Sequence, residues 1–416
     1  MDSGFFNVLS VAAFHALIQD FIPLRPPEQQ QLGHLLHSVL AEEIVSPGDL
    51  PPFSRSAMDG YAVRAADLFG AGESNPGYLQ VLGSVAVGEI ASTEIQSGQC
   101  MGIVTGAMLP PGADAVLMVE YTQAVSEQEI EVRRTVAPGE HIMFQGEDCR
   151  KGEAVLSPGT RIRAQEIGLL AALGITRAWV HPRPLVGIIS SGDELVAPEH
   201  EPGPGHIRDV NAWTLQSSIS GCGAAFQHFG IVPDQLEAIQ ERVAAAHAAC
   251  DLVLISGGSS VGMRDLTIQA LQGFPACTVL AHGVSISPGK PTILSRIEQK
   301  PVIGLPGQVT SVQVVFLILV LPLLRRLAGE DTRDFLRRWP SLPAQLARNL
   351  ASKPGREDYV RVRMEASSKG GLPVAVPLIG KSGLLKTMLQ AEGLIRIPAE
   401  QEGLEKNSEV KVLVFG

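Results

Sequence analysis

The sequence has few cysteines and no excess of positive charge, and both shortages narrow the class of protein. Its five cysteines are scattered over 416 residues without a C-x-x-C pair, which argues against a disulfide framework or a cysteine-ligated zinc site. Such a set is typical of free thiols in a reducing compartment. The formal net charge of −10 argues against a nucleic-acid partner, because nucleic acids favour a basic face.

Long apolar runs are missing as well. The longest, Val314 to Leu324, contains Pro322 and is well short of the roughly 20 residues that span a bilayer. The N-terminal segment carries Asp2 where a signal peptide has positive charge. We therefore predict a cytoplasmic protein with no membrane partner, in which the apolar run forms a buried helix.

The sequence does contain clear changes of pattern along the chain. Apolar residues recur at helical spacing from Val11 to Phe21 and again from Leu32 to Leu40, which predicts two N-terminal helices. Residues 51–151 have short alternating runs cut by glycine and proline, which is typical of an all-β module. Residues 182–328 alternate strand-like and helical segments, which predicts a parallel sheet covered by helices. The last residues return to short strands, typical of a small β-barrel or sandwich.

Two of the predicted parallel strands end in glycine-containing loops that carry acids. The segments are SSGDEL (190–195) and SGGSSVGMRD (256–265). Ligands bind beyond the carboxyl ends of strands in an open α/β sheet, and glycines let backbone amides approach an anion closely. A phosphate and a carboxylate 4 Å apart would repel by about 4 kcal/mol at an effective dielectric of 20. The loops therefore indicate a phosphate site with Mg²⁺, which prefers oxygen ligands; for either loop alone, a tight turn is the alternative.

The common nucleotide-binding fingerprints are absent from these loops. Neither continues into Gly-Lys-Ser/Thr, and neither has the spacing G-x-G-x-x-G, so neither a P-loop nor a dinucleotide fingerprint is supported. PGKPT (288–292) is only superficially similar to a P-loop, because Pro291 separates Lys290 from Thr292. Lys290 could instead add positive charge near a phosphate, and GLPGQVTSV (304–312) provides a third loop between a strand and a helix.

Seven motifs together are far more specific than any one of them. They are PPFSRSAMDGYAVRAADL, VTGAMLPPGADAV, GEDCRKGE, SSGDEL, SGGSSVGMRD, SPGKP and GLPG. Their order resembles that of the molybdopterin molybdenumtransferases, the molybdenum insertases that include the gephyrin E domain. The resemblance extends over essentially the whole chain.

The resemblance implies a multidomain α/β fold with four domains. These are a mixed N-terminal linker domain (1–50 and 152–181), an inserted all-β domain (51–151), a molybdopterin-binding α/β domain (182–328) and a C-terminal β-barrel (329–416). The implied reaction inserts molybdate into adenylylated molybdopterin and releases AMP in a Mg²⁺-dependent step. The implied assembly is a homodimer with sites shared between subunits, and an adenylyltransferase is a candidate protein partner.

The resemblance also implies three sets of site residues. The catalytic acids are Asp59, Asp148, Glu194, Asp234 and Asp265, of which Glu194 and Asp265 would ligate Mg²⁺. The pterin and nucleotide phosphates would contact Thr105, Ser191, Gly192, Gly257, Gly258, Ser259, Gly262, Pro306 and Gly307. Molybdate would be held by Lys290, Ser311, Arg356 and Ser382, which suits a tetrahedral dianion that needs cationic and hydroxyl donors.

Three departures from the family pattern keep alternatives open. HIMFQGED has no arginine before GED, Ser287 precedes PGKP where a basic or polar residue is usual, and Gln308 and Val309 replace an Asn-Pro pair. The losses of charge and stiffness motivate two alternatives: a molybdopterin-binding protein without turnover, and a tungstate-preferring variant. A nicotinamide-nucleotide hydrolase fits poorly, because the flanking β modules match the insertases.

Overall fold

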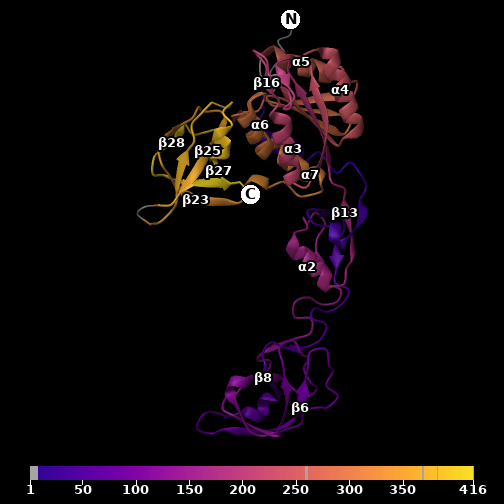
Figure 1. Ribbon diagram of the computed structural model, residues 1–416, viewed down its shortest axis with the longest axis vertical. Helices are drawn as coiled ribbons and strands as arrows, with labels where there is room; N and C mark the ends of the chain where they lie inside the picture. Colours follow the sequence, from indigo (N-terminus) through magenta and orange to yellow (C-terminus); the bar gives the residue numbers. More distant parts are fainter. Residues whose placement is uncertain (1–7, 258–260, 368–369, 382, 416) are drawn as a thin grey trace. The chain divides into compact units, whose positions relative to one another are not determined.

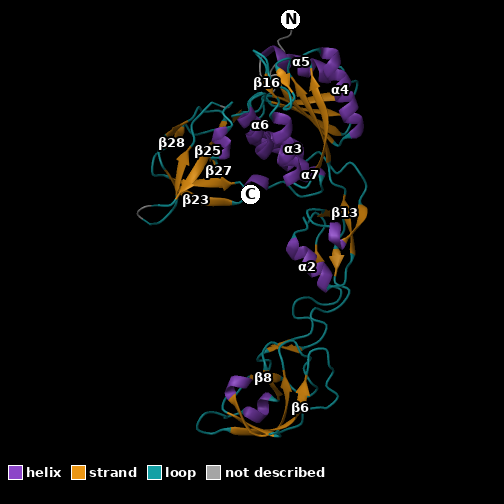
Figure 2. Ribbon diagram, viewed as in Figure 1, coloured by secondary structure: helices purple, strands orange, loops and turns teal. Residues whose placement is uncertain are grey.

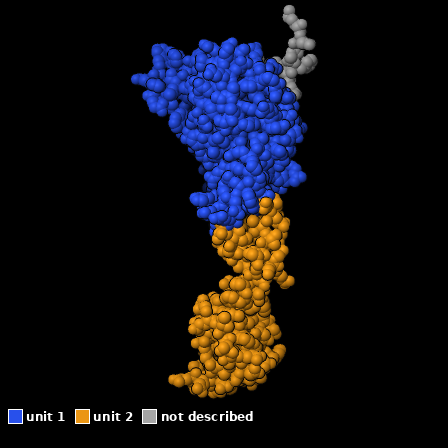
Figure 3. Space-filling model, turned by 90° about the vertical axis from the view of Figure 1, so that its right-hand side faces the viewer, with its two compact units in different colours: residues 1–41, 159–163, 177–416 blue, residues 42–158, 164–176 orange. Residues whose placement is uncertain are grey.

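The computed structural model describes residues 8–257, 261–367, 370–381 and 383–415, without the side chains of residues 261–265. The chain forms two compact units, which Figure 3 shows in different colours. Unit 1 comprises residues 1–41, 159–163 and 177–416, and unit 2 comprises residues 42–158 and 164–176. Each unit has hydrophobic clusters of its own.

Unit 1 is organised around a six-stranded sheet whose first four strands are parallel. The other two are antiparallel, so the predicted parallel sheet is confirmed with an antiparallel edge. In spatial order the strands are β17 (Ala225–Val232), β14 (Leu185–Ser191), β18 (Leu252–Gly257), β22 (Lys300–Leu305), β21 (Ile293–Ile297) and β19 (Cys277–His282).

Helices cover both faces of this sheet (Figures 1 and 2). Along β18, Leu252 and Leu254 pack into the cluster that contains α3, α6 and α7, while Val253 and Ile255 pack toward α4 and α5. A strand buried on both faces reads as a continuous apolar run, which is why LVLI carries no polar residue. The helices are α3 (Asn211–Gly221), α4 (Leu236–Ala249), α5 (Val261–Gln272), α6 (Val309–Val315) and α7 (Leu321–Leu327).

The apolar run forms a buried helical rod, as predicted. A π-helical turn, η4 (Phe316–Val320), joins α6 to α7. The rod Val309–Leu327 is long and apolar enough to cross a membrane, but 78% of its apolar window is buried inside the protein, as in the core helix of a globular domain. The His15 side chain from α1 (Val11–Ile18) contacts the Ile318 carbonyl oxygen within the π-turn, with Nε2 2.7 Å away.

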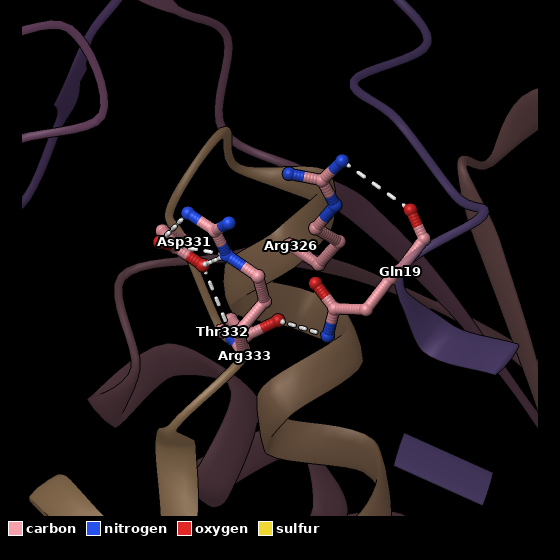
Figure 4. Close-up of polar contacts among 5 residues, drawn as sticks. All are labelled: Gln19, Arg326, Asp331, Thr332 and Arg333. Carbon is pink, nitrogen blue, oxygen red and sulfur yellow. Dashed lines mark hydrogen bonds and ion pairs between the residues drawn. The ribbon is translucent and has the colours of Figure 1, made fainter. Parts of the chain in front are cut away.

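Polar contacts also attach the chain after α1 to this rod and to the segment that follows it (Figure 4). Gln19 Nε2 donates to Thr332 Oγ1 at 3.1 Å, and Arg326 Nη2 donates to the Gln19 carbonyl at 3.3 Å. Arg333 forms an exposed ion pair with Asp331 at 2.6 Å. The N-terminal segment is therefore an integral part of the unit 1 core.

The second predicted N-terminal helix, from Leu32 to Leu40, is wrong. This stretch is a 3₁₀ turn, η1 (Leu32–His34), and a short strand, β2 (Val39–Leu40), which forms a sheet with β1 (Glu28–Gln31) and β13 (Arg177–His181). His37 has a φ of 67°, which an α-helix cannot contain. Leu35, Val39 and Leu40 are buried by tertiary contacts that short-range spacing does not reveal, while Leu36 is exposed.

The C-terminal strands close into a five-stranded barrel, as the fold prediction required. β25 pairs with both β26 and β27, which completes the ring through β23 and β29. A short strand, β20 (Ile286–Ser287), joins the sheet beside β25. The barrel strands are β23 (Ser341–Leu346), β25 (Glu357–Glu365), β26 (Val374–Pro377), β27 (Gly393–Ile397) and β29 (Glu409–Val414).

Unit 2 contains the predicted all-β module. Its six-stranded sheet has the order β8-β5-β7-β6-β10-β9, and a separate pair joins β4 (Arg55–Ser56) to β11 (Ile142–Met143). The helix α2 (Ala164–Ala172) belongs to the same unit. The sheet strands are β5 (Gly60–Val63), β6 (Gly77–Val85), β7 (Gln99–Ile103), β8 (Ala115–Met118), β9 (Thr122–Ser126) and β10 (Glu129–Val132).

Candidate active site

The carboxyl ends of neighbouring parallel strands bring several of the expected residues together. Ser191, at the end of β14, donates from Oγ to Asp234 Oδ1 at 2.7 Å, and the Asp234 amide donates to Asp193 Oδ1 at 3.2 Å. The Gly192 amide donates to the Val232 carbonyl at 3.3 Å. This edge of the sheet therefore carries a hydrogen-bonded group of a hydroxyl and two carboxylates, where open α/β sheets bind ligands.

Gly257 occupies a position where the backbone leaves no room for a side chain. Its φ is 138°, and a Cβ atom would lie 2.0 Å from the Ser191 carbonyl oxygen. Only glycine combines this φ with so close an approach. The glycine at the end of β18 is therefore needed to bring the β14 and β18 ends together, whatever ligand lies beyond them.

The glycine loop after β18 is shorter than the sequence suggested. The helix α5 begins at Val261, so the backbone of Gly262 and Asp265 is helical rather than part of a loop. Glycine in a helix costs about 0.5–1 kcal/mol relative to alanine, because its backbone loses more conformational freedom. Gly258 and Ser259 lie outside the described residues, and so does Ser382; the side chain of Asp265 is likewise not described.

Glu194 is an exposed acid at this edge, next to the exposed Asp193. It is exposed, and a Cβ on Gly192 would lie 2.6 Å from Glu194 Oε2, so the carboxylate folds back over the strand end. No group of three His, Cys, Asp or Glu side chains converges within the described residues. Mg²⁺ usually keeps several waters and binds one or two carboxylates together with phosphates. An exposed carboxylate at the strand ends fits that mode of binding.

Two residues that sequence reasoning missed organise the start of α3. Asp209 accepts from Ser190 Oγ at 2.5 Å and from the Ala212 amide at 3.1 Å. Asn211 Nδ2 donates to the Gly307 carbonyl at 2.8 Å, while its buried Oδ1 has no hydrogen-bond partner in the described part of the chain. A buried acceptor without a partner costs about 1–3 kcal/mol. The sequence signal was an acid shortly before a helix, which is a common capping pattern.

The loop after β22 is linked to the same edge of the sheet, because Asn211 donates to the Gly307 carbonyl. Pro306 and Gly307 follow β22 directly, and α6 begins at Val309. The Gln308 carbonyl accepts from the Ser311 amide at 2.9 Å and from the Val312 amide at 3.0 Å. Val309 is the first residue of the helix, where a proline would also be accommodated, so the departure from Asn-Pro does not prevent the helix from forming here.

Lys290 and Arg356 come from neighbouring backbone segments near this helix. The chain turns back after β20, so that the Val284 amide donates to the Lys290 carbonyl at 2.9 Å. The Glu357 amide donates to the Ser285 carbonyl at 2.9 Å. A Cβ on Gly289 would lie 2.4 Å from Val315 Cγ2 of α6, and α6 also contains the buried Ser311. The structure thus places the backbone segments that carry Lys290, Ser311 and Arg356 next to one another.

The Arg356 side chain has an acidic neighbour. Arg356 Nε lies 2.9 Å from Asp358 Oδ1, but the two atoms are not aligned for a hydrogen bond, while Nη2 donates to Oδ2 at 3.3 Å. Ser287 is the cross-strand partner of Asp358 in the β20–β25 register. The guanidinium is therefore held loosely by one carboxylate, and the side chain retains donors for an oxyanion.

Unit 2 holds its own expected acid in a different way. Asp59 Oδ1 accepts hydrogen bonds from the Thr105 amide and the Thr105 hydroxyl, both at 2.7 Å. The backbone bond first, and the hydroxyl bond second, lower the pKa of Asp59 below its usual value. Two neutral donors thus hold an exposed carboxylate in its charged form.

Asp148 lies on a segment that runs beside the one carrying Asp59. Its amide donates to the Leu50 carbonyl at 3.0 Å, and its side chain is exposed. On the adjacent β4–β11 pair, Arg55 is the cross-strand partner of Met143, with Nε 3.4 Å and Nη2 3.2 Å from the Met143 sulfur. Arg55 therefore supplies a positive charge next to HIMFQGED, the segment without an arginine before GED.

Three family models match consecutive parts of the chain. They are the MoeA N-terminal region (domains I and II) over residues 9–174, a "Probable molybdopterin binding domain" over residues 187–326, and the MoeA C-terminal region (domain IV) over residues 343–415. Together they cover most of the sequence in the order expected from the motifs.

Individual relatives match over nearly their full lengths. The molybdopterin molybdenumtransferase of Haemophilus influenzae is 31% identical over 93% of this chain and 94% of its own. That of Bacillus subtilis is 31% identical over 91% of this chain and 88% of its own. The crystal structure of the molybdopterin biosynthesis MoeA protein from Pyrococcus horikoshii OT3 has a TM-score of 0.82 and 32% identity, and covers 98% of this chain and 100% of that one.

Proposed function

The chain belongs to the MoeA family of molybdopterin molybdenumtransferases, and we propose that it inserts molybdate into adenylylated molybdopterin with release of AMP. It is accordingly a transferase of molybdenum cofactor biosynthesis. The observation that carries the finer proposal is the strand-end edge of unit 1, where Ser191, Asp234 and Gly257 meet. The experiment is a direct assay of AMP release from the adenylylated substrate with molybdate.

In this proposal the strand ends bind the phosphates of the substrate. Gly257 lets the β14 and β18 ends approach each other, and the Ser191 hydroxyl is oriented by its bond to Asp234 at 2.7 Å. Each of these contacts positions the substrate.

Mg²⁺ is proposed as the counterion of the phosphates, held by Glu194 and Asp265. When bound, it would neutralise phosphate charge beside the carboxylates, whose mutual repulsion would otherwise oppose substrate binding. Glu194 supports the proposal because it is exposed and lacks an ion-pair partner among the described residues.

Molybdate is proposed to bind Lys290, Ser311, Arg356 and Ser382. The first three are carried by neighbouring elements of unit 1, and Arg356 retains free donors beside Asp358. A guanidinium and an ammonium suit a dianion better than neutral donors alone, because charge-assisted hydrogen bonds are roughly twice as strong. A tungstate-preferring variant would use the same residues, so AMP release with molybdate and with tungstate should be compared.

We further propose a homodimer in which Asp59, Thr105 and Asp148 of one subunit act with Glu194 and Asp265 of the other. The proposal rests on the family and on the placement of the two acid sets in different units. To test it, Asp59→Asn and Glu194→Gln chains, each expected to be inactive alone, are unfolded and refolded together. Mixed dimers would contain one site with both changes and one with neither, so about a quarter of wild-type AMP release should return by random pairing.

Two outcomes would count against these proposals. If mixed dimers are confirmed by native mass and no activity returns, the site is not shared between subunits. If the wild-type protein binds molybdopterin but releases no AMP with Mg²⁺ and molybdate, a binding protein without turnover is the better description.

The buried rod of unit 1 and the five free cysteines support a cytoplasmic location, and an adenylyltransferase remains the proposed protein partner.

A further inference from the structure

Asp358 is a buried acid that contacts the side chain of Arg356. The Asp358 side chain is 11% exposed, whereas that of Arg356 is 37% exposed. Asp358 Oδ1 lies 2.9 Å from Arg356 Nε, and Asp358 Oδ2 accepts from Arg356 Nη2 at 3.3 Å. The carboxylate is therefore the buried member of this pair, and the guanidinium is the member that reaches solvent.

A second donor holds the Asp358 carboxylate in place. Ser352 lies on the far side of the turn that precedes β25, and its Oγ donates to Asp358 Oδ2 at 2.9 Å. A buried carboxylate is unfavourable unless hydrogen bonds and an opposite charge compensate it. Ser352 supplies a neutral hydrogen bond and Arg356 supplies the charge, so Asp358 is the centre of a small polar group within one turn.

The start of β25 is also anchored on its opposite face. Successive side chains of a strand point to opposite faces, so Glu357 points away from Asp358. Glu357 accepts from Arg396 through both of its oxygen atoms, each at 2.8 Å, and from the Tyr359 hydroxyl at 2.8 Å. The backbone that carries Asp358 is therefore held from both sides of the strand.

The contacts with Asp358 use one edge of the Arg356 guanidinium. Nε and Nη2 form the side-on edge of this planar group, and both lie next to the Asp358 carboxylate. A guanidinium has five N–H donors in a fixed fork, and Nη1 donates no hydrogen bond within the described residues. The end-on edge, formed by Nη1 and the outer N–H of Nη2, is therefore left for an oxyanion.

We propose that Asp358 is a positioning residue, which directs the end-on edge of Arg356 toward molybdate. This inference rests on the proposed function, in which Arg356 binds molybdate. A long arginine side chain has many rotamers, and ordering it before the ligand arrives removes that cost from binding. Asp358 thus strengthens molybdate binding without itself contacting the oxyanion.

The negative charge of Asp358 has an opposing effect, because a carboxylate repels a dianion. Loss of ordering would weaken molybdate binding when the charge is removed, and loss of repulsion would strengthen it, so the sign of the change distinguishes the two. We expect ordering to prevail. The guanidinium 2.9 Å away already compensates the carboxylate, so the pair repels a more distant anion only weakly.

The first test compares wild type with Asp358→Asn, which keeps the size of the side chain and removes its charge. Molybdate affinity of the full chain is measured by calorimetric titration, and AMP release is assayed separately. The dissociation constant for molybdate should rise about fivefold, because an unordered arginine has to be fixed on binding. The maximal rate of AMP release and the affinity for molybdopterin should stay near their wild-type values. An unchanged or lower dissociation constant would overturn the proposal.

Ser352→Ala provides a milder variant, which keeps the charge of Asp358 and removes one hydrogen bond to it. It remains informative if Asp358→Asn does not fold. The dissociation constant for molybdate should rise about twofold, because the carboxylate is less firmly held. Wild-type affinity in the folded Ser352→Ala protein would count against the proposal.

Glu365→Gln is the matched control for Asp358→Asn. Glu365 pairs with Arg363, two residues earlier on β25, and both side chains are half exposed. Removing this charge should leave the molybdate affinity unchanged. An equal loss of affinity in Glu365→Gln would show that the effect is not specific to Asp358, and the proposal would fail.

A double variant tests whether Asp358 acts through Arg356. In the Arg356→Ala background, Asp358→Asn should cause no further loss of molybdate affinity, because no guanidinium remains to be positioned. A purely structural role of Asp358 predicts losses that add. Additive losses in the double variant would therefore refute the positioning role.

The two assays separate this proposal from the proposed function. If the wild type binds molybdate but releases no AMP, the function is contradicted, while the titrations still test the positioning role. If the wild type releases AMP and Asp358→Asn has wild-type molybdate affinity, only the positioning role is contradicted. A wild type that binds no molybdate would overturn both.

Discussion

In unit 2, the Asp59 carboxylate already accepts two hydrogen bonds from Thr105, whereas in unit 1 Glu194 lies exposed at a strand end with no ion pair among the described residues. The first carboxylate is kept charged by neutral donors that belong to its own module. The second still has its oxygen atoms available to a cation. Under the proposed function, unit 2 would present a preorganised negative charge, and unit 1 would bind the metal and the phosphates.

Both regions nevertheless depend on a glycine that allows close backbone approach. A Cβ on Gly60, next to Asp59, would lie 2.0 Å from the Leu117 carbonyl oxygen, and a Cβ on Gly257 would lie 2.0 Å from that of Ser191. Backbone atoms cannot move aside as a flexible side chain can. The backbone next to Asp59 and at the strand ends near Glu194 therefore has no room for a side chain at these two glycines. Each glycine can be tested in its own unit.

The largest effect is expected from Gly257→Ala and Gly60→Ala. Each change should lower the free energy of unfolding by about 3 kcal/mol or more, because a fixed carbonyl occupies the place of the new methyl group. Since each unit has its own hydrophobic clusters, calorimetry should show a lower transition only for unit 1 with Gly257→Ala and only for unit 2 with Gly60→Ala.

A glycine without a close neighbour provides the control for these two changes. Gly88 has a φ of 86° and no heavy atom within 4 Å of the position of a Cβ. Gly88→Ala should cost only about 1 kcal/mol, from backbone conformation alone. If Gly257→Ala were no more destabilising than Gly88→Ala, the close approach of the β14 and β18 ends would not be a structural requirement.

A smaller effect is expected from Arg356→Ala, which tests whether molybdate and molybdopterin depend on different residues of unit 1. Loss of the guanidinium should raise the molybdate concentration needed for half-maximal AMP release by about tenfold, equivalent to one charge-assisted interaction of about 1.4 kcal/mol. Affinity for molybdopterin, measured by calorimetric titration, should stay near the wild-type value.

Arg363→Ala is the matched control for Arg356→Ala. Arg363 lies on β25, the strand that begins directly after Arg356, and it also pairs with an acid two residues later, Glu365, but both members of that pair are half exposed. That variant should leave the molybdate requirement unchanged. Equal losses of molybdate and molybdopterin affinity in Arg356→Ala would show that Arg356 does not distinguish the two ligands.

The smallest effect is expected from Thr105→Val in unit 2. Thr105 holds the pKa of Asp59 below its usual value, first through its backbone amide and then through its hydroxyl. Valine removes only the second bond, so the pKa of Asp59 should rise part of the way back. The carboxylate would then be protonated at higher pH, and the acidic limb of AMP release should move to higher pH, while Thr105→Ser should behave as wild type. If the wild type, Thr105→Val and Thr105→Ser had the same pH profile of AMP release, the ionisation of Asp59 would not limit the reaction.

Much of the fold could be predicted from local patterns. The apolar run LVLI predicted the buried strand β18, because a strand covered on both faces has no polar positions. The run from Val314 to Leu324 predicted a buried helix rather than a membrane span, and it lies within the buried rod. The prediction failed from Leu32 to Leu40, where the apolar spacing fits a helix but His37 adopts a φ of 67° and only Val39 and Leu40 form a strand.

The residue types of the candidate site were set by the sequence itself, because the motifs carry the acids, glycines and cations in a recognisable order. Only the tertiary structure decided which of them meet. Ser191 and Asp234 are 43 residues apart and bond because β14 and β17 are adjacent. Through the β20–β25 pairing, Ser287 becomes the cross-strand partner of Asp358, the acid that pairs with Arg356. Hydrogen bonds between residues so far apart depend on which strands are neighbours in the sheet, and spacing along the chain does not reveal that order.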